Sequence, residues 1–240
     1  MKIGIIGAGN MGQTLTKHFV KAGHEVSIAN SKGAETLQVL ASQIGIEAVS
    51  VYKVARENEL IIIAIPQSGI LKLPKDLFNG VSDDVIVIDN CNYFPLIRDG
   101  IIEELESDLT NSEWVSKIIG RPVIKVFNSI NFKSLAEKAR PKGDPERIAL
   151  SVSGDNSRHK EIIRNLLDQI GFDFYDNGLL KNSWKQEPVT PAYCTDLTLP
   201  KLTEAMQDFY QQKTAEAMAY IREQRKIKEE NILKEKQNNQ

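Results

Sequence analysis

The chain has 240 residues, of which 41% are hydrophobic and 26% are charged. This composition is that of an ordinary globular protein and excludes collagen-like and largely disordered classes. Thirty Lys and Arg residues oppose 32 Asp and Glu residues, which leaves a formal charge of −2. Because there is no overall basic field, nucleic acid is not expected as a partner. The length indicates one large domain, or one domain with an appendage.

Cysteine content and apolar runs narrow the class further. Cys91 and Cys194 are the only cysteines and lie far apart in the chain, so neither a disulfide framework nor a thiolate zinc site is expected. The three histidines follow no metal-ligand spacing, and we expect no metal. The longest apolar runs, such as residues 60–66, have the length of strands rather than of spanning helices. These observations predict a cytoplasmic protein without membrane partners.

Short runs of β-branched residues alternate with segments of helical period through most of the chain. This alternation predicts an α/β fold, with a doubly wound, mostly parallel sheet and helices on both faces. Several runs are continuously apolar, as strands buried on both faces should be. The predicted strands are residues 2–6, 25–29, 60–65, 85–89, 123–127, 148–153 and 172–175.

Two helices are clear from their apolar periodicity. The first follows the first predicted strand and ends at Gly23. The second spans residues 156–170, with Asp155 or Asn156 as its cap and Gly171 at its end. The stripe residues are Met11, Leu15, Phe19 and Ala22 in the first helix, and Ile162, Ile163, Leu166, Leu167 and Ile170 in the second.

The last 60 residues differ in character from the rest. Residues 181–200 show no period, which predicts a loop across the domain surface. A helix resumes after Pro200, and from Arg222 onward its apolar stripe thins into mixed charge, as in a frayed or protruding helix. We therefore divide the chain into a main domain, residues 1–200, and a C-terminal helix with a charged tail, residues 201–240. The residues expected on one face of this helix are Leu202, Met206, Phe209, Ala217 and Ile221.

The motif Gly7-Ala8-Gly9-Asn10-Met11-Gly12 follows the first strand directly and opens the first helix. This is the context of a dinucleotide-binding turn in a Rossmann-type fold. Gly7 permits the tight turn, Gly9 lets the backbone approach a pyrophosphate, and Gly12 lets the helix pack closely on the strand. The free amides of Asn10 and Met11, at the positive end of the helix dipole, complete the predicted anion site.

The end of the second strand, where the adenosine ribose lies, decides between NAD and NADP. It reads Asn30-Ser31-Lys32, with no carboxylate at the position where an NAD site needs one. Ser31 can donate a hydrogen bond and Lys32 supplies charge, so NADP is favoured as the cofactor. The alternative is an ordinary polar turn, since turns favour Asn, Ser and Gly in any case.

Ligands of open parallel sheets lie beyond the carboxyl ends of the strands. Ile65, Pro66 and Asn90 occupy such ends, and we expect them to border the nicotinamide half of the cofactor. Cys91 lacks a paired histidine and is interpreted as a small, partly buried thiol. No acid-base constellation is recognisable, so catalytic residues stay unassigned and the chemistry is expected to come from the cofactor.

These residues resemble a known family. The glycine motif followed by Asn30-Ser31-Lys32-Gly33 is similar to that of the NADPH-dependent deazaflavin-coenzyme reductases and to the NADPH domain of six-transmembrane metalloreductases. Residues 183–197, with Trp, Gln, Pro, Thr, Tyr and Asp in order, look like the closing segment of bacterial dinucleotide-binding members of this family. The resemblance covers roughly residues 1–200, and its second segment is the more specific.

The resemblance implies a domain that holds NADP(H) and exchanges hydride with a second redox cofactor or a small-molecule acceptor. It carries Ser31 and Lys32 over as contacts of the 2′-phosphate, and Pro66 and Asn90 as neighbours of the cofactor. The family commonly has glycine where this chain has Val189 and Cys194, so the loop on the acceptor side is expected to differ in shape.

We therefore predict an NADP(H)-dependent oxidoreductase whose acceptor is a flavin, a deazaflavin or a small organic molecule, with a homodimer as a possible assembly. One alternative is an NADP(H) sensor that acts on a partner through the charged C-terminal helix. Another is an imine or hydroxyacid dehydrogenase, although residues 201–240 are too few to form the helical domain that such enzymes usually add.

Overall fold

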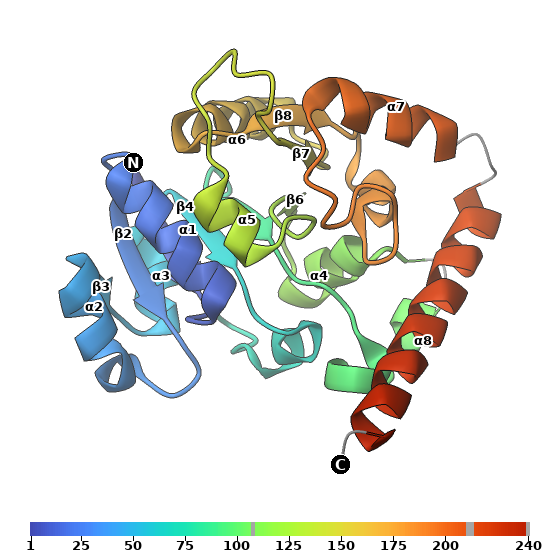
Figure 1. The fold of residues 1–240 in the computed structure, drawn as a ribbon. Helices are drawn as coiled ribbons and strands as arrows, with labels where there is room; N and C mark the ends of the chain where they lie inside the picture. Colours follow the sequence, from blue (N-terminus) through green and yellow to red (C-terminus); the bar gives the residue numbers. More distant parts are fainter. Residues whose placement is uncertain (107–108, 210–213, 239–240) are drawn as a thin grey trace.

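The computed structural model describes residues 1–106, 109–209 and 214–238 and shows a six-stranded parallel sheet covered by helices (Figure 1). The strand order is β3-β2-β1-β4-β5-β6, the order typical of a Rossmann fold. The predicted α/β class is therefore confirmed. The strands are β1 (Lys2–Ile6), β2 (Glu25–Ala29), β3 (Glu47–Ala48), β4 (Leu60–Ile63), β5 (Ile86–Asp89) and β6 (Ile124–Lys125).

The helices cover both faces of this sheet, because alternate residues of each strand point to opposite sides. Ile3 and Ile5 of β1 pack with α1 on one face, and Ile6 packs with Val54 and Ala55 of α3 on the other. The helices are α1 (Asn10–Lys21), α2 (Gln38–Ile44), α3 (Val51–Glu57), α4 (Asn111–Ile119), α5 (Phe132–Glu137), α6 (Ser157–Ile170), α7 (Leu199–Phe209) and α8 (Thr214–Asn238).

Three details of the predicted sheet differ from the structure. The edge strand β3 has only two residues, too few to show a periodic pattern in the sequence. The predicted strand 123–127 stops early, and Phe127 beyond it has a positive φ of 68°. The last two predicted strands form a separate two-stranded parallel sheet of β7 (Ala149–Val152) and β8 (Asp173–Asp176). An isolated antiparallel bridge between Lys125 and Ser153 connects this small sheet to β6.

Most of the segment after β8 does not cross the surface as predicted. It begins with the 3-10 helix η5 (Leu180–Gln186), in which Trp184 and Gln186 are buried. Apolar residues of α8 cover Trp184 from outside. The part up to Ala192 is therefore largely interior, and its lack of period reflects irregular packing. Residues 193–200 are half-buried or exposed, as the prediction of a surface loop expects.

The C-terminal residues expected on one helical face lie in two helices. Leu202 and Met206 of α7 pack near β7 and Ala192, whereas Ala217 and Ile221 of α8 pack on Trp184. Residues 210–213 of the predicted single helix, and the side chain of Phe209, lie outside the described part. The division of the chain at residue 200 stays a prediction.

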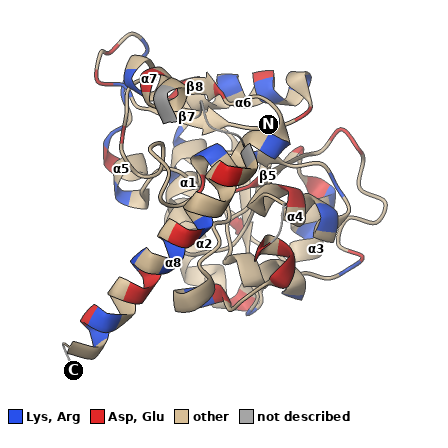
Figure 2. Ribbon diagram, turned by 90° about the vertical axis from the view of Figure 1, so that its right-hand side faces the viewer, with Lys and Arg blue, Asp and Glu red and all other residues tan. Residues whose placement is uncertain are grey.

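Helix α8 is held to the main domain by charged side chains as well as apolar ones. Arg225 and Glu229 are each only 2% exposed, and Glu229 accepts hydrogen bonds from the backbone of Leu96 at 2.7 Å and Ile97 at 3.1 Å. Arg225 lies over the ring of Tyr93, with 4.7 Å between its guanidinium carbon and the ring centre. The prediction of a frayed or protruding helix from Arg222 onward is thus wrong up to Glu229. The prediction of a protruding helix holds only for the exposed last turns (Figures 1 and 2).

Within the described residues, no helix is both long enough and apolar enough to span a membrane. Positively and negatively charged residues are interspersed along α8 from Arg222 onward (Figure 2).

Candidate functional site

The turn after β1 has the geometry that the glycine motif predicts. The Gly7 amide donates to Ala29 O at 2.8 Å and has a φ of 122°, a conformation that favours glycine. A Cβ at Gly7 would lie 2.2 Å from Ala64 O, and one at Gly12 would lie 1.9 Å from Gly7 O. These two glycines are therefore required by the close contact of α1 with the strands.

Gly9 differs from both, because a Cβ built on it meets no atom within 4 Å. It precedes α1 with an extended conformation, φ −74° and ψ −177°, which any residue adopts. The first turn of α1 contains no acidic residue, and its leading amides lack partners within the helix. The structure thus shows an open cradle over unpaired N–H groups, which fits a pyrophosphate.

A cavity of about 850 Å³ extends from this cradle between the ends of β1, β2 and β4. This is the point where the strand order reverses, the usual position of dinucleotides in this fold. Its volume and position suit an adenosine diphosphate moiety. Of the predicted site residues, Gly7, Gly9, Asn30, Ser31, Ile65 and Pro66 line it.

Lys32 is placed differently from the prediction. Its backbone N–H donates to Asn30 Oδ1 at 2.9 Å, which fixes the turn after β2, and its exposed side chain is absent from the cavity lining. Lys72 lines the cavity from the segment after β4, and Glu35 lines it beside Ser31. Sequence reasoning missed both, because only the residues directly after each strand were considered. Glu35 adds a carboxylate to the lining, although it does not stand at the position directly after β2.

A second cavity of about 330 Å³ shares Gly9, Ala64, Ile65 and Pro66 with the first. The predicted residues Asn10, Met11 and Asn90 line it, whereas Gly12 is buried beneath the turn. It also contains residues that the sequence did not single out. These are Phe94, Arg98 and Phe132, and beside them lie Tyr193 and Cys194 from the segment that carries the family resemblance.

The asparagines at the strand ends have different roles. The Asn92 and Asn128 side chains bond to each other, with Asn128 Nδ2 donating to Asn92 Oδ1 at 3.1 Å. Asn128 also donates to Gln186 O at 2.8 Å, so this pair holds the strand ends together. Asn90 is 7% exposed, and among the described residues no group pairs with its buried Oδ1. Asn90 is therefore the strand-end amide with unused hydrogen-bonding capacity.

A fully buried ion pair lies next in the chain to Asn90, which lines the second cavity. Lys125 Nζ lies 3.0 Å from Asp89 Oδ2, and both side chains are 0% exposed. Asp89 also accepts from Ser112 Oγ at 2.7 Å and from the Cys91 amide at 2.8 Å, and Lys125 donates to Cys91 O as well. These bonds fix the residues after β5 that border the cavity.

Residues 183–197, the more specific segment of the family resemblance, contact the residues behind the second cavity through Gln186 and Glu187. Gln186 Nε2 donates to Asn128 Oδ1 and Ser151 O, both at 2.9 Å, and Gln186 Oε1 accepts from Ser153 Oγ at 2.8 Å. Glu187 accepts from the Asn111 amide at 2.8 Å, and burial raises the pKa of its carboxyl. This segment thus ties β6 to the small sheet behind the site.

Val189 and Cys194 stand where the family commonly has glycine, and both have positive φ, 70° and 56°. The backbone therefore has the left-handed conformation that glycine favours. Such a conformation costs about 1 to 3 kcal/mol for other residues. The Val189 side chain packs against the cluster of Trp184 and α8, which offsets part of this cost.

Two further candidate side chains, Cys91 and His18, are buried and half-buried in the protein, respectively. Cys91 is 1% exposed and burial raises its pKa well above the ordinary value, so it is a buried thiol rather than a nucleophile. His18 contacts Leu135 O at 2.7 Å, and burial lowers its pKa. No cluster of metal-ligating side chains occurs in the described parts of the chain.

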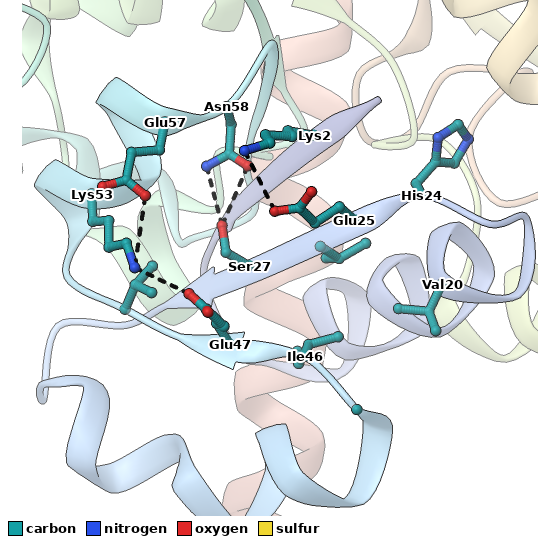
Figure 3. A pocket seen from close by; sticks show the side chains of 13 residues that line it. Lys2, Val20, His24, Glu25, Ser27, Ile46, Glu47, Lys53, Glu57 and Asn58 are labelled. Atoms are coloured by element: carbon teal, nitrogen blue, oxygen red, sulfur yellow. Dashed lines mark hydrogen bonds and ion pairs between the residues drawn. The ribbon is translucent and has the colours of Figure 1, made fainter.

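A third cavity, of about 320 Å³, lies at the amino ends of the strands, away from the glycine turn (Figure 3). Its charged side chains pair with one another: Lys53 with Glu47 at 3.1 Å and Glu57 at 3.7 Å, and Lys2 with Glu25 at 3.6 Å. This cavity has no counterpart in the ligand positions of open parallel sheets.

Residues 2–93 match the family model described as NADP oxidoreductase, coenzyme F420-dependent. Coenzyme F420 is a deazaflavin. The protein YjhV of Escherichia coli K12 is 38% identical over 56 residues, which are 23% of this chain and 41% of that protein. The aligned part thus spans about two fifths of this curated relative.

Solved structures extend the similarity beyond the matched segment. A hypothetical protein from Sinorhizobium meliloti is 28% identical with a TM-score of 0.69, over 82% of this chain and 95% of that one. A protein from Arthrobacter sp., described as a candidate F420-dependent NADP reductase, is 21% identical with a TM-score of 0.62, over 76% and 86%. At 21% identity, the similarity to the Arthrobacter protein shows a common fold.

The family match bears directly on the sequence predictions. The family matched over residues 2–93 consists of NADP oxidoreductases, in agreement with the predicted class and the predicted cofactor. By sequence over residues 2–93 and by fold over most of its length, the chain is similar to the coenzyme F420-dependent NADP oxidoreductases.

Proposed function

We propose that the protein holds NADP(H) in the larger cavity with its nicotinamide end reaching the second cavity, where an organic acceptor binds. The observation that carries this proposal is the shared wall, since Gly9, Ala64, Ile65 and Pro66 line both cavities. When bound, NADPH supplies a hydride. A flavin, a deazaflavin or a small organic molecule is the proposed acceptor, and the family match favours a deazaflavin.

The residues of the chain have positioning roles in this proposal. The amides at the start of α1 bind the pyrophosphate, and Asn90 offers its side-chain amide to the nicotinamide carboxamide. The pair of Asp89 and Lys125 holds the backbone after β5, which borders the second cavity at Asn90. Proximity and orientation account for much of the rate in hydride exchange between stacked rings, so an acid-base group is not required.

The cofactor preference is proposed to come from Ser31 and Lys72, which line the cavity, and from the exposed side chain of Lys32, which lies outside the lining next to Ser31 in the chain. We expect NADPH to bind about ten- to a hundredfold more tightly than NADH, because charge-assisted contacts to phosphate contribute about 1.5 to 3 kcal/mol. The double variant Lys32→Ala/Lys72→Ala should lose this preference and bind NADH as before. Isothermal titration with NADPH and with NADH measures the two affinities. The single variants Lys32→Ala and Lys72→Ala show how much of the preference each lysine contributes.

The matched control is Lys75→Ala, because Lys75 is exposed but does not line the dinucleotide cavity. It should leave both affinities unchanged. An equal loss of NADPH and NADH affinity in the double variant would count against the proposed phosphate contacts, and would leave a generic dinucleotide site.

The sensor alternative loses its structural motivation. One of its grounds, beside the dinucleotide motif and the lack of assignable catalytic groups, was an appendage past Ile221 poorly suited to packing on its own domain. In the structure, Glu229 and Arg225 of α8 are buried against residues 93–97. The helix is part of the wall behind the second cavity, which favours a role in the site itself.

A further inference from the structure

Arg98 carries the only full charge among the side chains that line the second cavity in the described structure. It belongs to the single-turn helix η3 (Pro95–Asp99), which the buried Glu229 of α8 caps through the amides of Leu96 and Ile97. The remaining lining is neutral, with rings from Phe94, Phe132 and Tyr193. A cation beside aromatic rings suits a ring compound that bears an anionic group.

The guanidinium of Arg98 is fixed in place by three contacts. Its Nε and Nη2 donate to Asp99 Oδ2 at 3.2 and 2.8 Å, Nη2 also donates to Asn92 O, and the group lies over the Phe94 ring at 4.8 Å. Among the described residues no group pairs with Nη1. The arginine is therefore preorganised, with one donor edge left for a ligand.

Asp99 pairs with Arg98 but does not itself face the cavity, because its side chain is 0% exposed and it is not among the lining residues. Its oxygens also accept from the Ser68 amide and hydroxyl at 3.1 Å and from the Phe94 amide at 2.8 Å. Asp99 thus acts as an anchor for Arg98. Ser68 lines the dinucleotide cavity, so the same anchor links the two halves of the site.

We propose that Arg98 is a specificity-determining residue, which selects acceptors that carry a phosphate or carboxylate beside the reducible ring. This inference rests on the proposed function, since it assigns the second cavity to the acceptor. A solely structural role for Arg98 would predict a change in stability without a change in acceptor selection.

The test measures ring binding rather than turnover. Equilibrium dialysis of the NADP⁺-loaded protein compares FMN with riboflavin for a phosphate, and 10-carboxymethylflavin with lumiflavin for a carboxylate. We expect at least one anionic probe to bind about tenfold more tightly than its neutral partner. Arg98→Met should bring that ratio close to one, and Arg98→Lys should keep part of it.

Arg56→Met is the matched control, because Arg56 also lies over a ring, that of Tyr52 at 4.8 Å, but lines neither cavity. It should leave the ratio unchanged. Equal affinities within both pairs, no binding of any probe, or an unchanged ratio in Arg98→Met would overturn the proposal. NADPH titration of the same samples separates these outcomes, because loss of NADPH binding would instead point to failure of the proposed function.

Discussion

Gly9→Val should abolish NADPH binding and leave the fold intact. The extended backbone at Gly9 accepts a β-branched residue, and its Cβ would meet no protein atom within 4 Å. The same side chain would fill the cradle over the first amides of α1. We expect the NADPH affinity to fall by at least about a hundredfold, or 2.7 kcal/mol, with an unchanged midpoint of thermal unfolding.

Gly12→Ala is the contrasting variant. Its Cβ would lie 1.9 Å from Gly7 O, so α1 must move away from the strand. We expect a lower unfolding midpoint, since overpacking typically costs about 1 to 3 kcal/mol. Calorimetry and nucleotide titration on both variants check the contrast. If Gly9→Val binds NADPH like the natural sequence, the pyrophosphate does not lie over Gly9.

Lys125→Met should destabilise the protein strongly, because it leaves the Asp89 carboxylate buried without its cation. Breaking one side of a buried pair costs about 3 to 5 kcal/mol. The double variant Lys125→Met/Asp89→Asn should recover part of this loss, since Ser112 can still bond to the amide oxygen. Urea denaturation of the single and double variants measures the free energies of unfolding.

The control is Lys53→Met, in which the ion pairs with Glu47 and Glu57 are exposed. Its expected cost is below about 1 kcal/mol. A similar small loss in Lys125→Met would show that the buried pair contributes little, and that the residues after β5 are held by other contacts.

The sheet and the dinucleotide turn could be predicted from the sequence because their signals are local. The runs at 3–6, 60–65 and 85–88 are apolar at every position, and the glycine motif directly follows the first of them. Parallel strands and short connections then constrain the topology. The dinucleotide position follows from the fold, since it is where the strand order reverses.

The acceptor side could not be predicted, because it is assembled from distant segments. Arg98 and Tyr193 are far apart in the sequence and meet only across the second cavity. The pairing of Asp89 with Lys125 likewise depends on the neighbouring positions of β5 and β6. The packing of α8 was missed because buried Arg225 and Glu229 read in sequence as part of a solvated, charged helix.

Stopped-flow oxidation of NADPH, followed by the nicotinamide absorbance, tests most directly whether the two adjoining cavities bring donor and acceptor together. Coenzyme F420, FMN, FAD and a panel of carbonyl and imine compounds serve as acceptors, with Gly9→Val as the inactive reference. We predict rapid oxidation by at least one ring acceptor, with coenzyme F420 the first candidate, and none above background in Gly9→Val. Tight NADPH binding without oxidation by any acceptor, or equal rates in Gly9→Val, would contradict the account.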